Sequence, residues 1–287
     1  MFSSHLNCLL CQSPRLKPLK GYEKDYLVKC SSCAFVFCSR IPTVEELTTH
    51  YKKYKRGGEI SAITIKRYDE LLDRFETFRK NNNILDIGCG DGYFLEVAKK
   101  RGWNVYGTEF TDEAIAVCHS KGINMQKGVL DPTNYKNINF DVVTSFEVIE
   151  HINNPVEEIG NIKSILRENG ALYITTPNFN SVSRFFLGPK WNVIEYPEHL
   201  SYYTPKTLTH FLKKHNFTKA KIETTGIHIR RFNQSVNSGA VTNTEETLRE
   251  KTETRLVYKM LKKSVNTFLN ITTSGDNLKA LFINNKS

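Results

Sequence analysis

Apolar residues occur along this chain in short runs that alternate with stretches of helical period. Five such runs cover residues 84–87, 104–110, 123–126, 140–145 and 170–176. Short apolar runs predict strands, and the helical stretches between them predict crossover helices. The alternation therefore predicts an α/β fold built on a parallel sheet. Two later runs, 219–225 and 278–283, are the expected sixth and seventh strands.

A glycine-rich turn follows the first run. Gly88, Gly90 and Gly92 stand at alternate positions after Asp86, and apolar residues resume at helical spacing over 94–98. Such a turn lets a ligand lie against bare backbone, where a Cβ would collide with it. The spacing differs from the Gly-x-Gly-x-x-Gly of NAD enzymes. It resembles the first motif of class I S-adenosylmethionine (SAM)-dependent methyltransferases. This resemblance implies a Rossmann-like, seven-stranded sheet with helices on both faces.

An acidic residue ends the second apolar run. Glu109 stands 17 residues after Gly92. In a doubly wound sheet this strand end lies beside the glycine turn, where a carboxylate can accept hydrogen bonds from both ribose hydroxyls. The alternative is an acid that precedes a helix beginning near Thr111. We favour the ribose-binding interpretation because of the spacing.

The resemblance also assigns cofactor contacts by position. Asp131 stands near the place where the family contacts adenine, although backbone groups of Val129 and Leu130 are an equal alternative. The cofactor-binding residues expected in all are Asp86, Gly88, Cys89, Gly90, Gly92, Tyr93, Glu109, Phe110, Asp131, Ser145 and Phe146.

The stretch 140–155 resembles the fourth-strand motif of ubiquinone-type and natural-product methyltransferases. In it, Glu147, Glu150 and His151 stand at i, i+3 and i+4, which predicts one face of a helical turn. The pattern resembles the divalent-metal ligands of ubiquinone-biosynthesis O-methyltransferases and of small-RNA 2′-O-methyltransferases. The RNA enzymes add a later histidine, and His199 stands in a suitable place here.

Two roles remain open for these side chains. A cation such as Mg²⁺, held by Glu147, Glu150, His151 and His199, would draw in substrate hydroxyls and lower their pKa. Alternatively, the Glu-His pairs orient the helix, or His151 or His199 acts as a metal-free general base with Glu150 beside it. We favour these metal-free roles because many relatives with this motif need no metal.

Four cysteines form two Cys-x-x-Cys pairs near the start of the chain. Cys8 and Cys11 make the first pair, Cys30 and Cys33 the second, and 18 residues separate them. Two such pairs supply four thiolates to a tetrahedral Zn²⁺, as in zinc ribbons. Disulfides are the alternative, but adjacent pairs in an apparently cytosolic chain argue against them. Four protein ligands leave no open position, so we expect a structural ion.

The motifs divide the chain into three parts. We expect a zinc-ribbon module at 1–40, a helical cap or linker at 41–81, and the methyltransferase domain at 82–287 with a helical insertion at about 229–274. Tyr51, Tyr54 and Tyr68 of the cap either close over the cofactor or pack in the core. The insertion is amphipathic; a helix packed on the sheet is its ordinary interpretation, with a substrate lid, a dimer contact or a membrane-surface helix as alternatives.

Charge is distributed unevenly along the 287 residues. The net charge of +10 comprises +6 over 1–80, −5 over 81–199 and +9 over 200–287. An acidic core suits a cationic sulfonium ligand, and basic flanks attract phosphate in a nucleotide sugar, a lipid head group or RNA. No apolar run reaches the length of a membrane span, and no secretory signal is evident, so we expect a cytoplasmic protein. The sequence does not indicate an oligomeric state.

The expected activity is methyl transfer from SAM to a small molecule. The stretch 197–208 resembles a segment of bacterial methyltransferases that modify sugars, lipids and secondary metabolites. We therefore expect the acceptor to be a hydroxyl of a sugar, polysaccharide precursor, lipid-linked molecule or secondary metabolite. An RNA methyltransferase and a sugar C-methyltransferase are the alternatives. The RNA alternative is weakened because Thr176, Pro177 and Asn178 stand where amine methylation of bases requires Asn/Asp-Pro-Pro-Tyr/Phe.

Overall fold

The computed structural model describes residues 3–51, 58, 60–227 and 256–285. These residues fold into two compact units. The ribbon unit comprises Met1–Thr48, Thr176–Leu208 and Ile222–Lys279. The sheet unit comprises Thr49–Thr175, Thr209–Lys221 and Ala280–Ser287.

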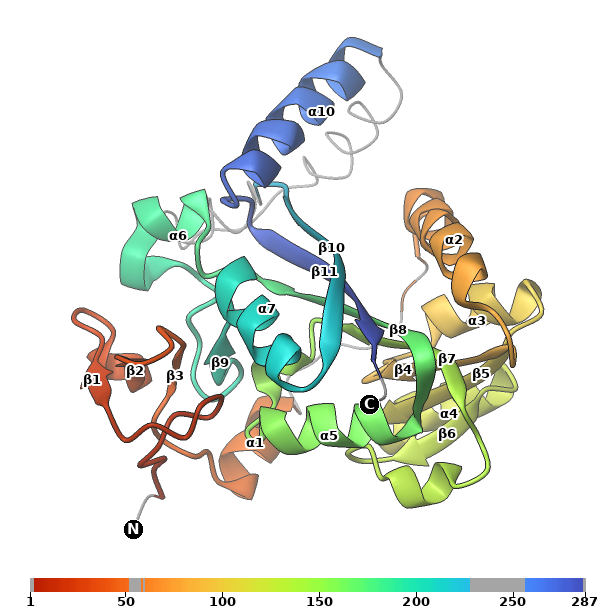
Figure 1. Ribbon diagram of the computed structural model, residues 1–287, viewed down its shortest axis with the longest axis horizontal. Helices are drawn as coiled ribbons and strands as arrows, with labels where there is room; N and C mark the ends of the chain where they lie inside the picture. Colours follow the sequence, from red (N-terminus) through yellow and green to blue (C-terminus); the bar gives the residue numbers. More distant parts are fainter. Residues whose placement is uncertain (1–2, 52–57, 59, 228–255, 286–287) are drawn as a thin grey trace. The chain divides into compact units, whose positions relative to one another are not determined.

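A seven-stranded sheet carries the order β10-β11-β8-β7-β4-β5-β6 (Figure 1). The neighbours β8, β7, β4, β5 and β6 are parallel. All seven strands predicted from the sequence are therefore confirmed. Their bounds are β4 Asn83–Ile87, β5 Asn104–Glu109, β6 Asn124–Lys127, β7 Phe140–Phe146, β8 Leu166–Pro177, β10 Phe217–Thr225 and β11 Asn277–Asn284.

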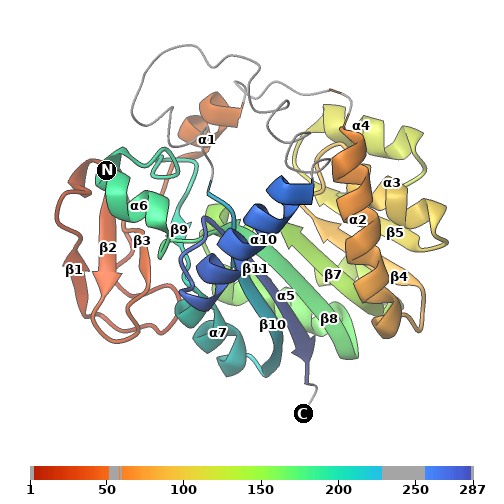
Figure 2. The same ribbon diagram turned by 90° about the horizontal axis from the view of Figure 1, so that it is seen from above.

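Helices cover both faces of the parallel strands in the sheet unit, as predicted (Figure 2). One face packs against α2 (Ala62–Phe75), α3 (Tyr93–Lys100) and α4 (Asp112–Ser120). Its core cluster includes Ile84, Val105 and Val142. The alternating residues Leu85, Val143 and Leu172 are fully buried outside that cluster, because successive side chains of a strand point to opposite faces. The helix α5 (Pro155–Ile165) covers this second face.

The strand order reverses beside β4. The chain runs outward from β4 to β5 and β6, then crosses back so that β7 pairs with the other side of β4. Because these strands are parallel, the carboxyl ends of β4, β5 and β7 meet at one edge of the sheet. Ligands of open α/β sheets bind in the crevice at such a reversal.

A second, four-stranded sheet belongs to the ribbon unit. It has the order β1-β2-β3-β9 and is antiparallel throughout. The strands are β1 Leu16–Pro18, β2 Leu27–Cys30, β3 Val36–Cys38 and β9 Ser201–Tyr202. The last strand lies far along the chain, so residues beyond the predicted module complete its sheet. Trp191, Val193 and Tyr202 join Leu27 and Val36 in one buried cluster.

The remaining helices are shorter or lie at the ends of these elements. They are α1 Val44–Tyr51, α6 Val182–Leu187, α7 Pro205–Lys214 and α10 Leu256–Ile271, with 3-10 turns at Glu23–Asp25, Glu76–Phe78, Pro132–Tyr135, Ile149–His151 and Gly188–Lys190. The predicted insertion lies outside the described residues over 228–255, and its described remainder contains α10. None of the described helices is long and apolar enough to cross a bilayer.

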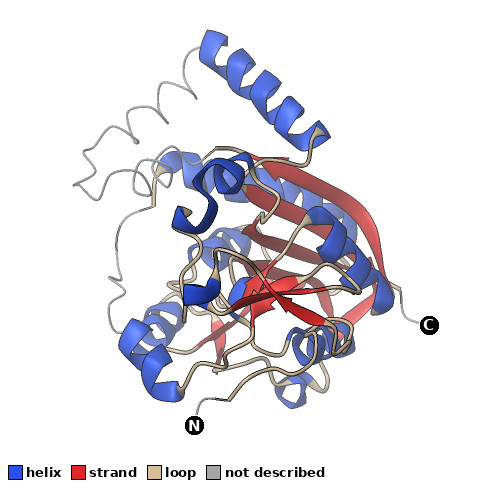
Figure 3. Cartoon of the chain, turned by 90° about the vertical axis from the view of Figure 1, so that its left-hand side faces the viewer, coloured by secondary structure: helices blue, strands red, loops and turns tan. Residues whose placement is uncertain are grey.

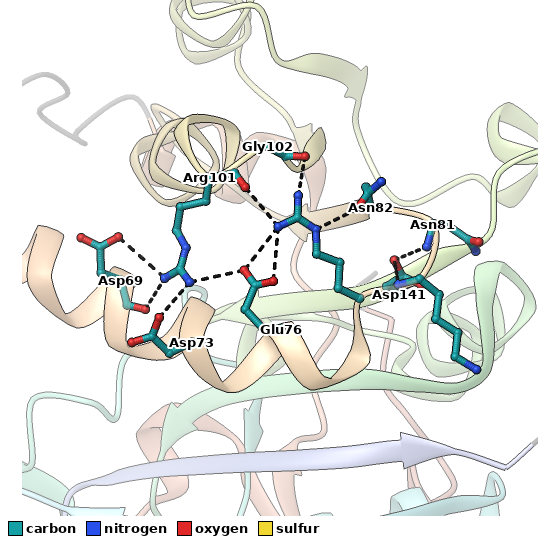
Figure 4. Close-up of polar contacts among 10 residues, drawn as sticks. Asp69, Asp73, Glu76, Asn81, Asn82, Arg101, Gly102 and Asp141 are labelled. Carbon is teal, nitrogen blue, oxygen red and sulfur yellow. Dashed lines mark hydrogen bonds and ion pairs between the residues drawn. The ribbon is translucent and has the colours of Figure 1, made fainter.

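A buried carboxylate joins three segments of the sheet unit (Figure 4). Asp141, which is fully buried at the start of β7, accepts hydrogen bonds from the backbone N–H groups of Lys80 (2.9 Å) and Asn81 (2.7 Å). It also accepts one from Arg167 Nε at 2.6 Å. The segment before β4 and the start of β8 are thereby fixed to β7. Nearby, Asp73 pairs with Arg101 at 2.8 Å, but its side chain is 69% exposed.

We predict that Asp141→Asn destabilises the sheet unit far more than Asp73→Asn does. Loss of the buried charge leaves Arg167 uncompensated, a change that costs about 3 to 5 kcal/mol. The exposed pair contributes at most about 1 kcal/mol. Urea unfolding followed by circular dichroism measures both variants. Similar unfolding midpoints for the two would show that Asp141 does not hold these segments together.

Candidate active site

The glycine turn leaves β4 at the strand reversal. Gly88, Gly90 and Gly92 have φ angles of 63°, 53° and 70°, a region that other residues rarely adopt. A Cβ at Gly88 would lie 2.7 Å from Val148 Cγ2, so this glycine is required by packing. A Cβ at Gly90 would meet no atom within 4 Å. Gly90 therefore presents bare backbone to open space.

The end of β5 holds the turn in place. The hydroxyl of Thr108 accepts a hydrogen bond from Gly88 N at 3.2 Å, and its carbonyl accepts one from Cys89 N at 3.0 Å. The Glu109 carboxylate accepts a third from Gly90 N at 3.1 Å. Sequence reasoning missed Thr108. Its only signal was a hydroxyl residue one position before the strand's acidic end.

Glu109 lies where the sequence predicted, at the end of β5 beside the turn. Only 9% of the residue is exposed. Its Oε1 accepts hydrogen bonds from Phe110 N (2.8 Å) and Thr111 N (3.3 Å), while Oε2 faces Gly90 N. These backbone donors fix the orientation of the carboxylate. In the alternative interpretation, Glu109 is only an acid that precedes the helix beginning at 112. That interpretation explains its hydrogen bond with Thr111 N but not the one with Gly90 N.

Asp86 is a buried acid beneath the turn. It is 3% exposed, and Thr144 Oγ1 donates a hydrogen bond to its Oδ1 at 2.7 Å. Burial raises the pKa of Asp86 to about 8 against the opposing effect of this hydrogen bond, and the nearby acidic groups Cys118 and Glu109 raise it further. A cationic ligand would favour the ionised carboxylate. The residue can therefore serve as a counter-charge to a sulfonium or ammonium group.

Cys89 points into the protein rather than outward. Its Sγ lies 3.9 Å from both Cys118 Sγ and Met125 Sδ. The hydrogen bond with Cys118 and burial raise the pKa of the Cys89 thiol, which therefore stays protonated and is a poor nucleophile. Tyr93 follows the turn, and Lys121 Nζ stands 3.9 Å from its ring centroid. Lys121 was not predicted; it also donates to Asp91 O at 2.8 Å.

Residues after β5 and β6 lie at the same edge of the sheet, because Glu109 pairs in register with Lys127. Phe110 and Val129 are both 62% exposed there. The Asp131 carboxylate caps a 3-10 turn, with Oδ1 accepting a hydrogen bond from Thr133 N at 2.9 Å. Hydrogen bonds from Thr133 lower the pKa of Asp131. This capping role is an addition to the adenine contact predicted for it.

Ser145 and Phe146 end β7 beside the turn. Ser145 is 5% exposed and pairs in register with Ile87. The Phe146 ring packs edge-on against Phe94, with centroids 5.0 Å apart. Tyr68 packs on the same Phe94 ring at 5.4 Å, so it has the core role left open for it. Tyr54 of the predicted cap lies outside the described residues.

The segment after β7 does not form the predicted helical face. A 3-10 turn covers only Ile149–His151, and Glu147 precedes it with a φ of 53°. The prediction that Glu147 shares a helical turn with Glu150 and His151 is therefore wrong. Instead, the backbone N–H of Glu147 donates a hydrogen bond to Thr175 O at 3.0 Å. This contact keeps Glu147 out of the helical turn that follows. A left-handed non-glycine residue costs about 1 to 2 kcal/mol and is typical of functional sites.

Glu150 and His151 stay together in this turn. The Glu150 side chain is 2% exposed, the His151 side chain is 20% exposed, and their Oε1 and Nε2 atoms are 4.0 Å apart. His199 belongs to the ribbon unit, where its Nδ1 lies 2.6 Å from the Val193 carbonyl. A carbonyl can only accept, so Nδ1 carries the proton and Nε2 is the basic nitrogen.

The four paired cysteines converge in the ribbon unit. Their sulfur atoms all lie within 4.8 Å of one another. Cys8 Sγ is 3.5 Å from Cys33 Sγ, and Cys11 Sγ is 3.6 Å from Cys30 Sγ. Tetrahedral bonds of about 2.3 Å to zinc place sulfurs about 3.8 Å apart, so the set fits this metal. All four are free thiols, contrary to the disulfide alternative.

The two cysteine pairs have the same backbone form. In each, the residue after the second cysteine is left-handed, with φ of 60° at Gln12 and 64° at Ala34. Each of these residues donates its N–H to the carbonyl of the first cysteine at 2.9 Å. The repeated turn aims both thiols of a pair at one point. Two such knuckles facing each other form a closed four-ligand site.

The chain is similar in sequence to known methyltransferases. Residues 60–222 match the family described as "Methyltransferase domain". The ubiquinone biosynthesis O-methyltransferase of Pelagibacter ubique is 31% identical over 202 residues, which cover 67% of this chain and 79% of the relative. The enzyme of the same name from Actinobacillus pleuropneumoniae is 30% identical over 106 residues, covering 33% and 45%.

Solved structures share the fold at low identity. A SAM-dependent methyltransferase from Archaeoglobus fulgidus has a TM-score of 0.53 and 19% identity, covering 84% of this chain and all of that one. The phosphoethanolamine N-methyltransferase 2 of Haemonchus contortus, solved with SAM, has a TM-score of 0.50 and 18% identity, covering 77% and 53%. With the family match and the sheet order, these findings lead to one conclusion. The chain belongs to the class I SAM-dependent methyltransferase family.

Proposed function

We propose that this enzyme transfers the methyl group of SAM to a hydroxyl of a small molecule. The observation that carries the SAM site is the open face of Gly90 next to the fixed carboxylate of Glu109. The choice of an oxygen acceptor is supported by the relatives, which are named ubiquinone biosynthesis O-methyltransferases.

In this proposal SAM lies across the strand ends of the sheet unit. Glu109 binds the ribose hydroxyls, since an oriented carboxylate accepts two hydrogen bonds from a vicinal diol. Phe110 and the segment 129–131 enclose the adenine. The methionine part extends past Gly88 toward Ser145, with Asp86 as the buried counter-charge.

The chemistry is a direct displacement at the methyl carbon. The acceptor oxygen forms a bond to this carbon while the bond from carbon to sulfur breaks, leaving S-adenosylhomocysteine. Holding the two reactants in line supplies much of the acceleration, because an intermolecular reaction becomes effectively intramolecular. Exclusion of water protects the sulfonium from side reactions.

A hydroxyl acceptor needs a base to remove its proton. We assign this role to His151, a partly exposed imidazole with the Glu150 carboxylate 4.0 Å away. A divalent cation such as Mg²⁺ held by Glu147, Glu150 and His151 of the sheet unit is the alternative, and it would lower the pKa of a coordinated hydroxyl.

The charge of the chain supports an anionic acceptor. Residues 200–287 carry a net charge of +9, which favours an acceptor with a phosphate or another anionic group. A phosphate-bearing sugar, such as a nucleotide sugar, polysaccharide precursor or lipid-linked sugar, has both this charge and free hydroxyls.

A structural zinc ion in the ribbon unit completes the proposal. Cys8, Cys11, Cys30 and Cys33 would be its ligands, supported by the close approach of their sulfur atoms. Backbone N–H groups already help one ligand to ionise: burial acts to raise the pKa of Cys30, but hydrogen bonds from Cys33 and Ser32 outweigh it and lower the pKa to about 6. The ion would link the knuckle of Cys8 to that of Cys30.

We predict that Glu109→Gln weakens SAM binding by about ten- to a hundred-fold, because hydrogen bonds to a charged acceptor contribute about 1.5 to 3 kcal/mol. Isothermal titration calorimetry with SAM measures the change. Glu113→Gln, an exposed substitution in α4, is the matched control and should leave affinity unchanged. Equal affinities for both variants would remove Glu109 from the cofactor site.

We predict that His151→Ala lowers methyl transfer by about 10²- to 10⁴-fold, the usual contribution of a general base. Small-molecule extract incubated with enzyme and methyl-labelled SAM, followed by mass spectrometry, gives the rate. SAM affinity should be retained, and the control His119→Ala, which changes an exposed side chain of α4, should be fully active. Activity that survives in His151→Ala rules out the assigned base; activity lost on EDTA treatment and restored by Mg²⁺ favours the metal alternative.

We predict about one zinc ion per purified chain, lost in the double variant Cys11→Ser/Cys33→Ser because two ligands no longer suffice for a structural site. Inductively coupled plasma mass spectrometry measures the metal content. Cys38→Ser changes a buried thiol outside the cluster and should keep the ion. Zinc-free wild-type protein with free thiols after purification without chelators would contradict the assignment.

A further inference from the structure

The helix α10 makes contact with the rest of the ribbon unit through one side. Leu269 is 2% exposed. The side-chain carbonyl of Asn270 accepts a hydrogen bond from Thr224 N at 3.0 Å, and that of Asn266 accepts one from Gly226 N at 2.9 Å. These three residues lie within about 100° of one another around the helix, at 100° per residue. They define its inner side.

An apolar stripe lies on the opposite side of α10. Met260, Phe268 and Ile271 are 64%, 63% and 77% exposed. Their spacing places them within about 80° of one another and centres them about 160° from the inner side. Figures 1 and 3 show α10 extending away from the other described elements of its unit. The helix therefore presents these three large apolar side chains outward.

A second exposed apolar group adjoins the end of this helix. Val182 N, at the start of α6, donates a hydrogen bond to Ser274 O at 2.9 Å, three residues beyond α10. The side-chain amide of Asn180 donates to Thr273 O at 3.2 Å. On α6, Phe185 and Phe186 are 75% and 71% exposed, with ring centroids 5.5 Å apart. Both helices thus expose aromatic side chains in the same part of the ribbon unit.

The charge of these two segments has one sign. Residues 178–194 and 256–275 together contain five lysine or arginine residues and no aspartate or glutamate. Lys190 and Lys263 are exposed. Large apolar side chains flanked by basic ones are typical of helices that lie in the interface of a membrane. A second copy is a poor fit, because a two-fold contact would bring ten positive charges together.

We propose that α6 and α10 dock this enzyme on the surface of an anionic phospholipid bilayer. The outward side chains Phe185, Phe186, Phe268 and Ile271 enter the boundary between head groups and acyl chains. Lys190 and Lys263 pair with lipid phosphates, and each contributes about five-fold to binding. The attachment is peripheral, since none of the described helices can span a bilayer. It does not depend on which acceptor is methylated.

Vesicle co-sedimentation tests this surface with the full chain. Vesicles of phosphatidylcholine and phosphatidylglycerol at 70:30 are compared with phosphatidylcholine alone. We expect binding to the anionic vesicles only, weakened at least ten-fold in Phe185→Ser/Phe186→Ser and in Phe268→Ser/Ile271→Ser. Lys263→Glu should weaken it at least five-fold. The matched control Leu6→Ser/Val44→Ser removes two apolar side chains that are 82% and 79% exposed elsewhere in the unit, and should bind as the wild type does.

Each variant is first shown to bind SAM, because a misfolded chain would also lose vesicle binding. Wild-type binding that is absent, or equal on neutral vesicles, overturns the proposal. So does equal binding by all variants. Analytical ultracentrifugation without lipid tests the other occupant: a dimer that forms with rising concentration and is abolished by Phe268→Ser/Ile271→Ser would assign the surface to a second copy instead.

Discussion

The hydrogen bond between Gly90 N and the Glu109 carboxylate is the contact on which the proposed cofactor site depends. It joins the turn after β4 to the end of β5, and the hydroxyl of Thr108 supports it from one residue away. Without it the turn would lose its fixed position, and the carboxylate its orientation. The parallel register of β4 and β5 brings these two ends together, so the site is a direct result of the sheet order.

Buried polar groups stabilise both ends of the sheet. At the end away from the glycine turn, Asp141 of β7 fixes the segment before β4 and the start of β8. Asp86 lies buried under the turn with its pKa raised to about 8 by burial and by neighbouring acidic groups. Holding an acid there disfavours its charge until a cation arrives. The ionisation of Asp86 is therefore linked to the binding of a cationic ligand.

Local pattern predicted most of the fold and the cofactor turn. Seven strands, the glycine turn and the position of Glu109 follow from runs and spacings that short-range physics determines. The sequence could not predict β9, because two residues carry no periodicity and pair with β3 only through tertiary contact. The prediction that Glu147 lies in a helical turn is wrong for a related reason. Its hydrogen bond to Thr175, which is distant in sequence, overrides the helical spacing. Thr108 and Lys121 were missed because their roles depend on the folded turn.

A crystal structure with S-adenosylhomocysteine tests the central claim most directly. The account predicts that both ribose hydroxyls lie within about 3 Å of the Glu109 carboxylate oxygens, a normal hydrogen-bond distance. The amino-acid part of the ligand should pass along the open face of Gly90. A nucleoside bound elsewhere, or in this crevice with its ribose turned away from Glu109, would contradict it.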